Sequence, residues 1–203
     1  MHRYFLGLSR AMAIAGGFVL SLLVAIVVIS IVGRELNGFL HDDFMQTYMS
    51  GFANWMLDAH LPGLWGPIEL GPINGDYELV EAGMAFTIFA FLPLAQITGS
   101  HASVDIFVSW LPESADRVLT MLIEILFAIV LVVVAWQLWL GTLSKMDRGQ
   151  TTFLLQFPLW WPYALSVVGA VAAAVVAVYM ALVRIYEVVT KRHVVPAGEG
   201  AEH

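Results

Sequence analysis

The chain has 203 residues, of which 60% are hydrophobic and only 12% are charged, and its formal net charge is −7. A water-soluble domain has about a quarter of its residues charged, so this composition predicts a protein embedded in a membrane. The nine Lys and Arg residues form no basic patch, which argues against nucleic-acid binding, and the absence of cysteine excludes disulfides, thiolate metal sites and cysteine nucleophiles.

The first predicted membrane helix covers about residues 11–35. The run from Ala11 to Gly33 contains no charged residue and is long enough to cross the hydrocarbon layer of a membrane. Arg3 and Arg10 precede this run, as basic residues do in a secretory signal peptide, but the apolar core of such a peptide has only about 7 to 15 residues. We therefore expect an uncleaved transmembrane helix.

An insertion of about residues 37–76 follows the first span and contains no Lys or Arg. Aromatic and methionine side chains recur in it every four residues, a spacing typical of an amphipathic helix. These positions are Phe44, Tyr48, Phe52 and Met56. Asp42 or Asp43 is suited to cap the start of this helix. The helix either lies on the outer membrane surface or docks a protein partner.

Three further membrane helices are predicted, at about residues 79–100, 117–144 and 160–185. In the last of them, small residues recur every four positions, and small residues let helices approach closely in lipid. This predicted packing face consists of Gly169, Ala173, Ala177 and Ala181. It contacts either another helix of the same chain or another subunit.

The distribution of basic residues predicts the topology. Four spans place both termini on one side of the membrane, and short segments rich in Lys and Arg stay in the cytoplasm. Six of the nine basic residues fall in the termini and the middle loop, against three on the other side. We therefore expect one membrane domain over residues 1–203, with cytoplasmic termini, an extracytoplasmic insertion and a flexible tail at about residues 192–203.

Glu124 is the only charged side chain well inside a predicted span. A carboxylate in the membrane is costly unless function or pairing retains it, so Glu124 is either a proton-coupling group or a residue that is hydrated or paired with Arg117. None of the six histidines lies within a predicted span, which argues against haem ligation in the bilayer and against a Ser-His hydrolase. We expect no catalytic residue, cofactor or metal site.

Several residues scattered along the chain carry a family likeness. They are Gly33 and Arg34 after the first span, Glu78 and Glu81 before the second, His101, Val104, Asp105, Leu111 and Pro112 after it, and Thr151, Phe157, Pro158 and Tyr163 before the fourth. Together they resemble the small membrane subunit of tripartite ATP-independent periplasmic (TRAP) transporters, the DctQ-like family. The likeness covers the first span and about residues 75–185, whereas the stretch from Leu40 to Ile73 is longer than the connection usual in the family.

The resemblance implies one part of a three-part secondary transporter in a bacterial inner membrane. In such a transporter a soluble binding protein captures the substrate outside, usually a small organic acid, and a larger membrane subunit carries it inward, typically driven by sodium. The small subunit mostly braces the large one. The longer stretch is then a platform for the binding protein or an interfacial insertion.

Two other classes of function compete with this interpretation. An autonomous four-helix exporter would use Glu124 to exchange protons, and it would transport without any partner. A cytochrome-type membrane anchor would bind haem, which the positions of the histidines disfavour.

Overall fold

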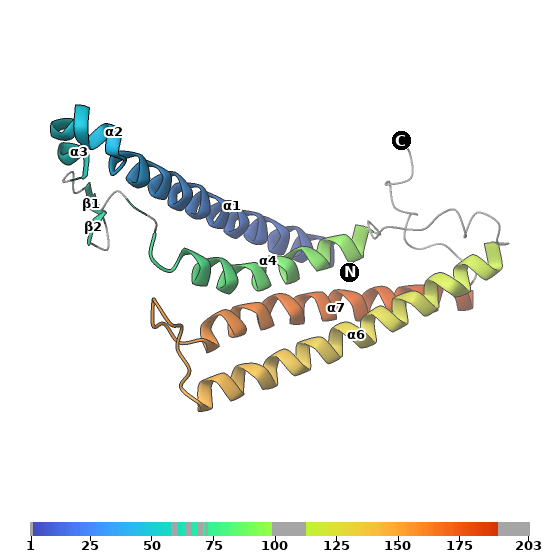
Figure 1. The fold of residues 1–203 in the computed structure, drawn as a ribbon. Helices are drawn as coiled ribbons and strands as arrows, with labels where there is room; N and C mark the ends of the chain where they lie inside the picture. Colours follow the sequence, from blue (N-terminus) through green and yellow to red (C-terminus); the bar gives the residue numbers. More distant parts are fainter. Residues whose placement is uncertain are drawn as a thin grey trace. The chain divides into compact units, whose positions relative to one another are not determined.

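The computed structural model describes residues 2–57, 61–63, 66–68, 71, 73–98 and 113–190. This part of the chain is predominantly helical (Figure 1). Among the described residues, four helices are long and apolar enough to cross a membrane. They are α1 (His2–Leu40), α4 (Asp76–Thr98), α6 (Glu113–Asp147) and α7 (Trp160–Thr190). The predicted all-helical membrane class with four spans is confirmed, and the contacts within the chain form two compact units.

The helices extend beyond the predicted spans, most clearly at α1. Its 39 residues measure about 58 Å at about 1.5 Å per residue, whereas the hydrocarbon layer is about 30 Å thick. The first charged residue after an apolar run marks where the apolar layer ends, and it does not stop a helix. Backbone hydrogen bonding therefore continues through Arg34 and Glu35 to Leu40.

The core of the first unit, within residues 1–20, 82–151 and 157–203, is centred on α7, which lies beside α6 (Figure 1). The predicted small-residue face of α7 is buried within this unit at all four positions, Gly169, Ala173, Ala177 and Ala181. The three alanines share a cluster with Ala128 and Leu131 of α6. This face therefore packs against helices of the same chain.

Gly169 of α7 packs closely against α4. A Cβ atom added there would lie 2.9 Å from Cβ of Phe89 and 3.4 Å from the backbone nitrogen of Ala90. Gly16 of α1 is crowded in the same way, since an added Cβ would lie 2.8 Å from Cβ of Ala90. Small side chains at these positions bring the helix backbones together, which favours helix association in lipid.

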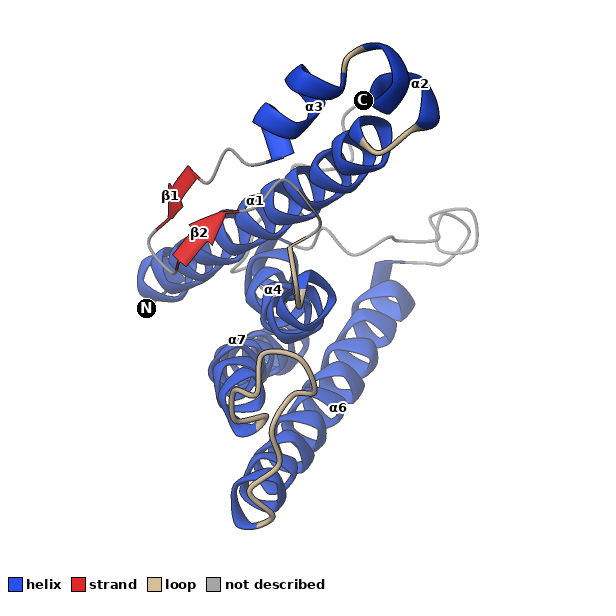
Figure 2. Ribbon diagram, turned by 60° about the vertical axis from the view of Figure 1, so that its left-hand side comes forward, coloured by secondary structure: helices blue, strands red, loops and turns tan. Residues whose placement is uncertain are grey.

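The second unit comprises residues 21–81 and 152–156 and contains the insertion. Two short helices, α2 (Asp43–Tyr48) and α3 (Ser50–Leu57), follow α1, and two three-residue strands, β1 (Leu61–Gly63) and β2 (Gly66–Ile68), pair antiparallel (Figure 2). Pro62 is paired with Pro67 in this hairpin.

One amphipathic helix was predicted for the aromatic repeat, whereas the structure divides it in two at Met49. The backbone of Met49 leaves the helical region (φ −136°, ψ 34°). The change of direction lets Ala53 of α3 reach a small core with Met45 and Leu40. Asp42 occupies the predicted cap position of α2, but its side chain makes no capping hydrogen bond.

Replacing Gly169 by alanine tests the packing of α7. Alanine normally stabilises a helix by about 1 kcal/mol relative to glycine. At Gly169 the new methyl group meets Phe89, so we expect a net loss of about 1 to 3 kcal/mol and a lower melting temperature in detergent. Gly38→Ala is the matched control, because nothing lies within 4 Å of a Cβ at that position. Equal melting temperatures for the two variants would contradict the packing described here.

Candidate functional site

The start of α4 brings together two carboxylates, Asp76 and Glu78, directly after a turn at Gly75. Gly75 has a φ of 82°, a conformation that residues with a Cβ rarely adopt, and an added Cβ would also meet the Leu155 side chain. Asp76 and Glu78 lie in the first turn of α4, where the helix dipole favours negative charge. The turn therefore positions two acidic groups at the end of the helix.

Asp76 joins α4 to α1 through the buried hydroxyl group of Ser30. Ser30 Oγ donates to Asp76 Oδ2 at 2.5 Å and accepts from the backbone N–H of Ile73 at 3.1 Å. The other oxygen of Asp76, Oδ1, accepts from the backbone N–H of Tyr77 at 2.7 Å. Arg34, one turn beyond Ser30 on α1, attracts the Asp76 carboxylate electrostatically. One serine thus links the segment before α4 to the side of α1.

Gly33 permits this close approach of α1. A Cβ atom at Gly33 would overlap the carbonyl oxygen of Gly71. Gly71 lies five residues before Asp76, in the segment that approaches α1 near Ser30. The adjacent Arg34 is exposed. Gly33 and Arg34 carry part of the family likeness. Gly33 leaves room for the backbone of Gly71, and Arg34 attracts the carboxylate of Asp76.

Glu78 holds the segment 152–156, which belongs to the connection between α6 and α7. Its two carboxylate oxygens accept backbone N–H groups, from Leu154 at 2.6 Å and from Leu155 at 2.9 Å. A carboxylate that accepts two backbone donors makes stronger hydrogen bonds than a neutral acceptor does. Glu78 therefore fixes the backbone of this segment from the start of α4.

The same connection is closed at its base within the first unit. Thr151 and Pro158 form an isolated antiparallel bridge, and the backbone N–H of Leu159 donates to the carbonyl of Gln150 at 2.9 Å. The carbonyl of Pro158 accepts from the N–H of Trp161 at the start of α7. Pro158 thus ends the loop and leads into the helix.

A buried polar pair connects α4 to α6 in the first unit. Gln96 Nε2 donates a hydrogen bond to Oε2 of Glu124, and the two residues are only 1% and 9% exposed. Arg184 of α7 also attracts Glu124 electrostatically, and its guanidinium pairs with Glu187 at 2.8 Å. Three helices therefore contribute to one polar cluster.

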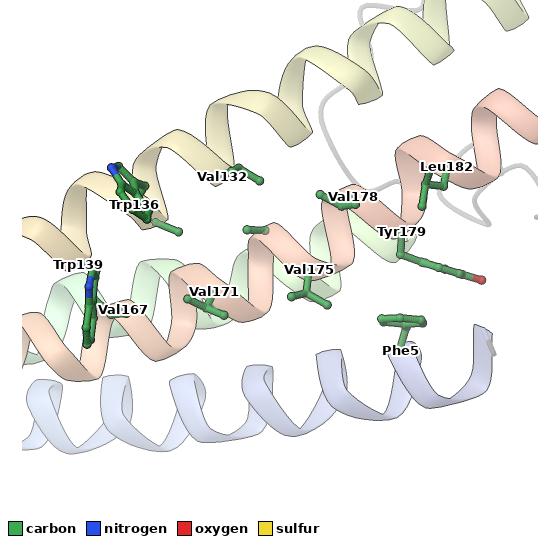
Figure 3. Close-up of a pocket in the computed structure, with 12 residues that line it drawn as sticks. Phe5, Val132, Trp136, Trp139, Val167, Val171, Val175, Val178, Tyr179 and Leu182 are labelled. Carbon is green, nitrogen blue, oxygen red and sulfur yellow. The ribbon is translucent and has the colours of Figure 1, made fainter.

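An apolar groove of about 700 Å³ lies along α6 and α7 (Figure 3). It is lined by Phe5, Val132, Ala135, Trp136, Trp139, Val167, Val171, Ala174, Val175, Val178, Tyr179 and Leu182. The ring of Phe5 stacks on that of Tyr179 at one end, with 4.2 Å between centroids. Such a lining suits hydrocarbon, and it offers little to position a polar substrate.

The structure places the residues singled out from the sequence at separate locations. Glu78 and Pro158 make the contacts described above, Glu81 is exposed, and His101, Asp105, Pro112 and the predicted tail at 192–203 lie outside the described residues. Of the aromatic repeat, Phe44, Tyr48 and Phe52 are exposed and Met56 is half-buried. Among the described residues, no group of three His, Cys, Asp or Glu side chains could hold a metal ion.

Sequence reasoning missed Ser30, Asp76 and Gln96. The signal for Gln96 was its amide within an otherwise apolar run of α4, since an amide in lipid needs a hydrogen-bond partner. Asp76 carried the signal of an acidic residue directly after a glycine and before an apolar run. Ser30 carried none, because serine is common in membrane helices.

Comparison with known families gives one match. Residues 69–187 match the family model described as "Tripartite ATP-independent periplasmic transporters, DctQ component". The matched range includes α4, α6, the acidic anchors Asp76 and Glu78, and the pair Gln96 and Glu124, whereas α1, α2 and α3 lie outside it. A search of curated proteins and a search of solved structures returned no match.

The anchoring role of Glu78 predicts a local effect of its removal. In Glu78→Ala the N–H groups of Leu154 and Leu155 lose their acceptor, so we expect faster amide exchange in peptides that cover residues 152–156. Hydrogen exchange followed by mass spectrometry measures this. Glu81→Ala, which removes an exposed carboxylate one turn further on, is the control and should leave these peptides unchanged. Unaltered exchange in Glu78→Ala would rule out the anchor.

Proposed function

The chain belongs to the DctQ component family of TRAP transporters, and on this premise we propose that it is the small, non-catalytic membrane subunit of such a transporter. In this role it braces a larger membrane subunit and contains no substrate site of its own. The complex takes up a small organic solute, for which we propose an organic acid. A soluble binding protein delivers the solute, and an ion gradient, typically of sodium, drives the uptake.

The observation that carries this proposal is that the buried carboxylates of Glu124 and Glu187 both have polar partners within the chain. A proton-coupled carrier needs an ionisable group that alternately binds and releases a proton during transport. Glu124 instead accepts a hydrogen bond from the Gln96 amide and is attracted electrostatically by Arg184. Glu187 forms a salt bridge with Arg184. Groups occupied in this way connect helices, which supports a bracing role over an exchanging one.

The topology follows the charge distribution. The protein is a multi-pass membrane protein. We place both termini in the cytoplasm, because the termini and the middle loop carry six of the nine basic residues. The acidic anchors at the start of α4 and the insertion at 37–76 are then extracytoplasmic. The cluster of Gln96 and Glu124 lies toward the cytoplasmic ends of the helices.

The first test is purification from the native membrane in a mild detergent, followed by mass spectrometry of the co-eluting proteins. The proposal predicts a larger and very hydrophobic membrane protein in about equal amount, because a bracing subunit needs a permanent partner. A membrane protein of unrelated function and similar abundance, purified in the same way, serves as the control for non-specific co-purification in detergent. Recovery of this chain alone in several mild detergents would contradict the proposal and favour the autonomous exporter.

Substitution of Glu124 separates the two functions. In Glu124→Gln the new amide oxygen still accepts from Gln96, so we expect the reconstituted complex to retain most of its transport. An exporter that exchanges protons at Glu124 would lose all transport. Gln96→Leu is the companion variant, and because it leaves a buried carboxylate without its donor, we expect a loss of about 1 to 3 kcal/mol in stability. Abolished transport in Glu124→Gln, with the complex still assembled, would exclude a purely bracing role.

A further inference from the structure

Four large aromatic side chains are exposed on α2 and α3, and together they form an aromatic face. They are Phe44, Tyr48, Phe52 and Trp55, which are 61%, 74%, 46% and 68% exposed. They associate in two pairs along the chain, with 5.0 Å between the ring centroids of the first pair and 6.2 Å in the second. Exposed apolar clusters of this kind mark sites of interaction with a protein or a membrane.

The aromatic face has a fixed support. Met45 and Ala53, on the opposite side of the two short helices, are buried against Leu40 at the end of α1. Gln46 Nε2 also donates to the carbonyl oxygen of Leu40 at 2.8 Å. The aromatic side chains are therefore presented outward by a small core of their own, and they are not needed to build it.

In the described residues 35–57, which carry the aromatic face, the charged side chains Glu35, Asp42 and Asp43 are all acidic and exposed. The segment 35–81 contains eight acidic residues and no Lys or Arg. The acidic residues are Glu35, Asp42, Asp43, Asp58, Glu69, Asp76, Glu78 and Glu81. Asp42 and Asp43, both exposed at the start of α2, repel anionic lipid headgroups and attract a partner with a basic surface.

The height of the aromatic face above the membrane also distinguishes a protein from a lipid surface. The apolar run of α1 ends at Gly33, and the seven residues from Arg34 to Leu40 extend the helix by about 10 Å. The headgroup region on each side of the hydrocarbon is only about 5 to 8 Å thick. The small core at Leu40 therefore lies at or beyond the outer edge of the headgroups, where a soluble protein can reach the aromatic face.

We propose that the aromatic face of α2 and α3 docks the soluble binding protein of the transporter, through an apolar contact bordered by Lys or Arg side chains of that protein. This inference rests on the proposed function. The face lies outside the family-matched residues 69–187. Aromatic side chains supply the contact energy at such interfaces, and the acidic surroundings speed association.

The test measures binding of the purified binding protein to the complex of small and large subunits in nanodiscs of zwitterionic lipid. The double variant Tyr48→Ala/Trp55→Ala removes two exposed rings and leaves the core at Leu40 intact. We expect its dissociation constant to rise about tenfold or more. Tyr77→Ala is the matched control, because Tyr77 is also 74% exposed but lies at the start of α4, and we expect it to bind as the wild type does.

The charge contribution has its own measurement. Wild-type affinity should fall as salt is raised, since screening weakens attraction between exposed charges. Asp42→Asn/Asp43→Asn should show a smaller salt dependence with the aromatic rings unchanged. Equal salt dependence in the two proteins would overturn the charge complementarity on which the choice of partner rests.

Two results would overturn the inference while leaving the proposed function standing. One is an assembled complex whose affinity for the binding protein is unchanged in Tyr48→Ala/Trp55→Ala. The other concerns the fluorescence of Trp55, measured as the difference between the wild type and Trp55→Phe. If brominated lipid quenches this fluorescence, the aromatic face lies in the membrane. Failure of the chain to assemble with a larger subunit would instead refute the proposed function, and the inference with it.

Discussion

The close approach of helix backbones at small residues is the constraint on which the rest of this structure depends. Between lipid tails, apolar side chains gain nothing from burial against protein rather than lipid, so association relies on tight packing. Gly169 brings α7 against α4, and Ala173, Ala177 and Ala181 bring it against α6. With the small residues turned inward, larger apolar side chains of the same helices line an outward-facing groove.

Polar contacts complete what packing begins, and they concentrate where helices start or end. Asp76 and Glu78 connect the start of α4 to Ser30 of α1 and to the segment 152–156. Near the other end of α4, Gln96 reaches Glu124 on α6. The hydrogen bond between Gln96 and Glu124 is buried, where little water competes for either partner, so it favours one register of α4 against α6.

The insertion follows different physics from the membrane helices. It is acidic, it contains no Lys or Arg, and it buries a small core of Leu40, Met45 and Ala53. The family match begins at residue 69, after this segment. The small core of the insertion therefore lies outside the matched residues.

The sequence by itself determined the four spans and predicted a small-residue face on α7, because both are local properties. A charge-free run long enough to cross the hydrocarbon marks a membrane helix, and a four-residue spacing of small residues marks one side of it. The family likeness also rested on local residues, among them Glu78 and Pro158, and the family match over residues 69–187 confirmed the family. Helix ends were predicted less well, since helical hydrogen bonding continues past the apolar layer.

Only the tertiary structure decided which polar groups meet. Gln96 and Glu124 are 28 residues apart, and Ser30 and Asp76 are 46 apart, so no spacing rule connects them. The break at Met49 was equally invisible to a four-residue repeat, because it depends on where Leu40 offers a surface for Ala53. Local patterns predict what a helix can present, whereas its partners depend on the neighbours that the folded chain places beside it.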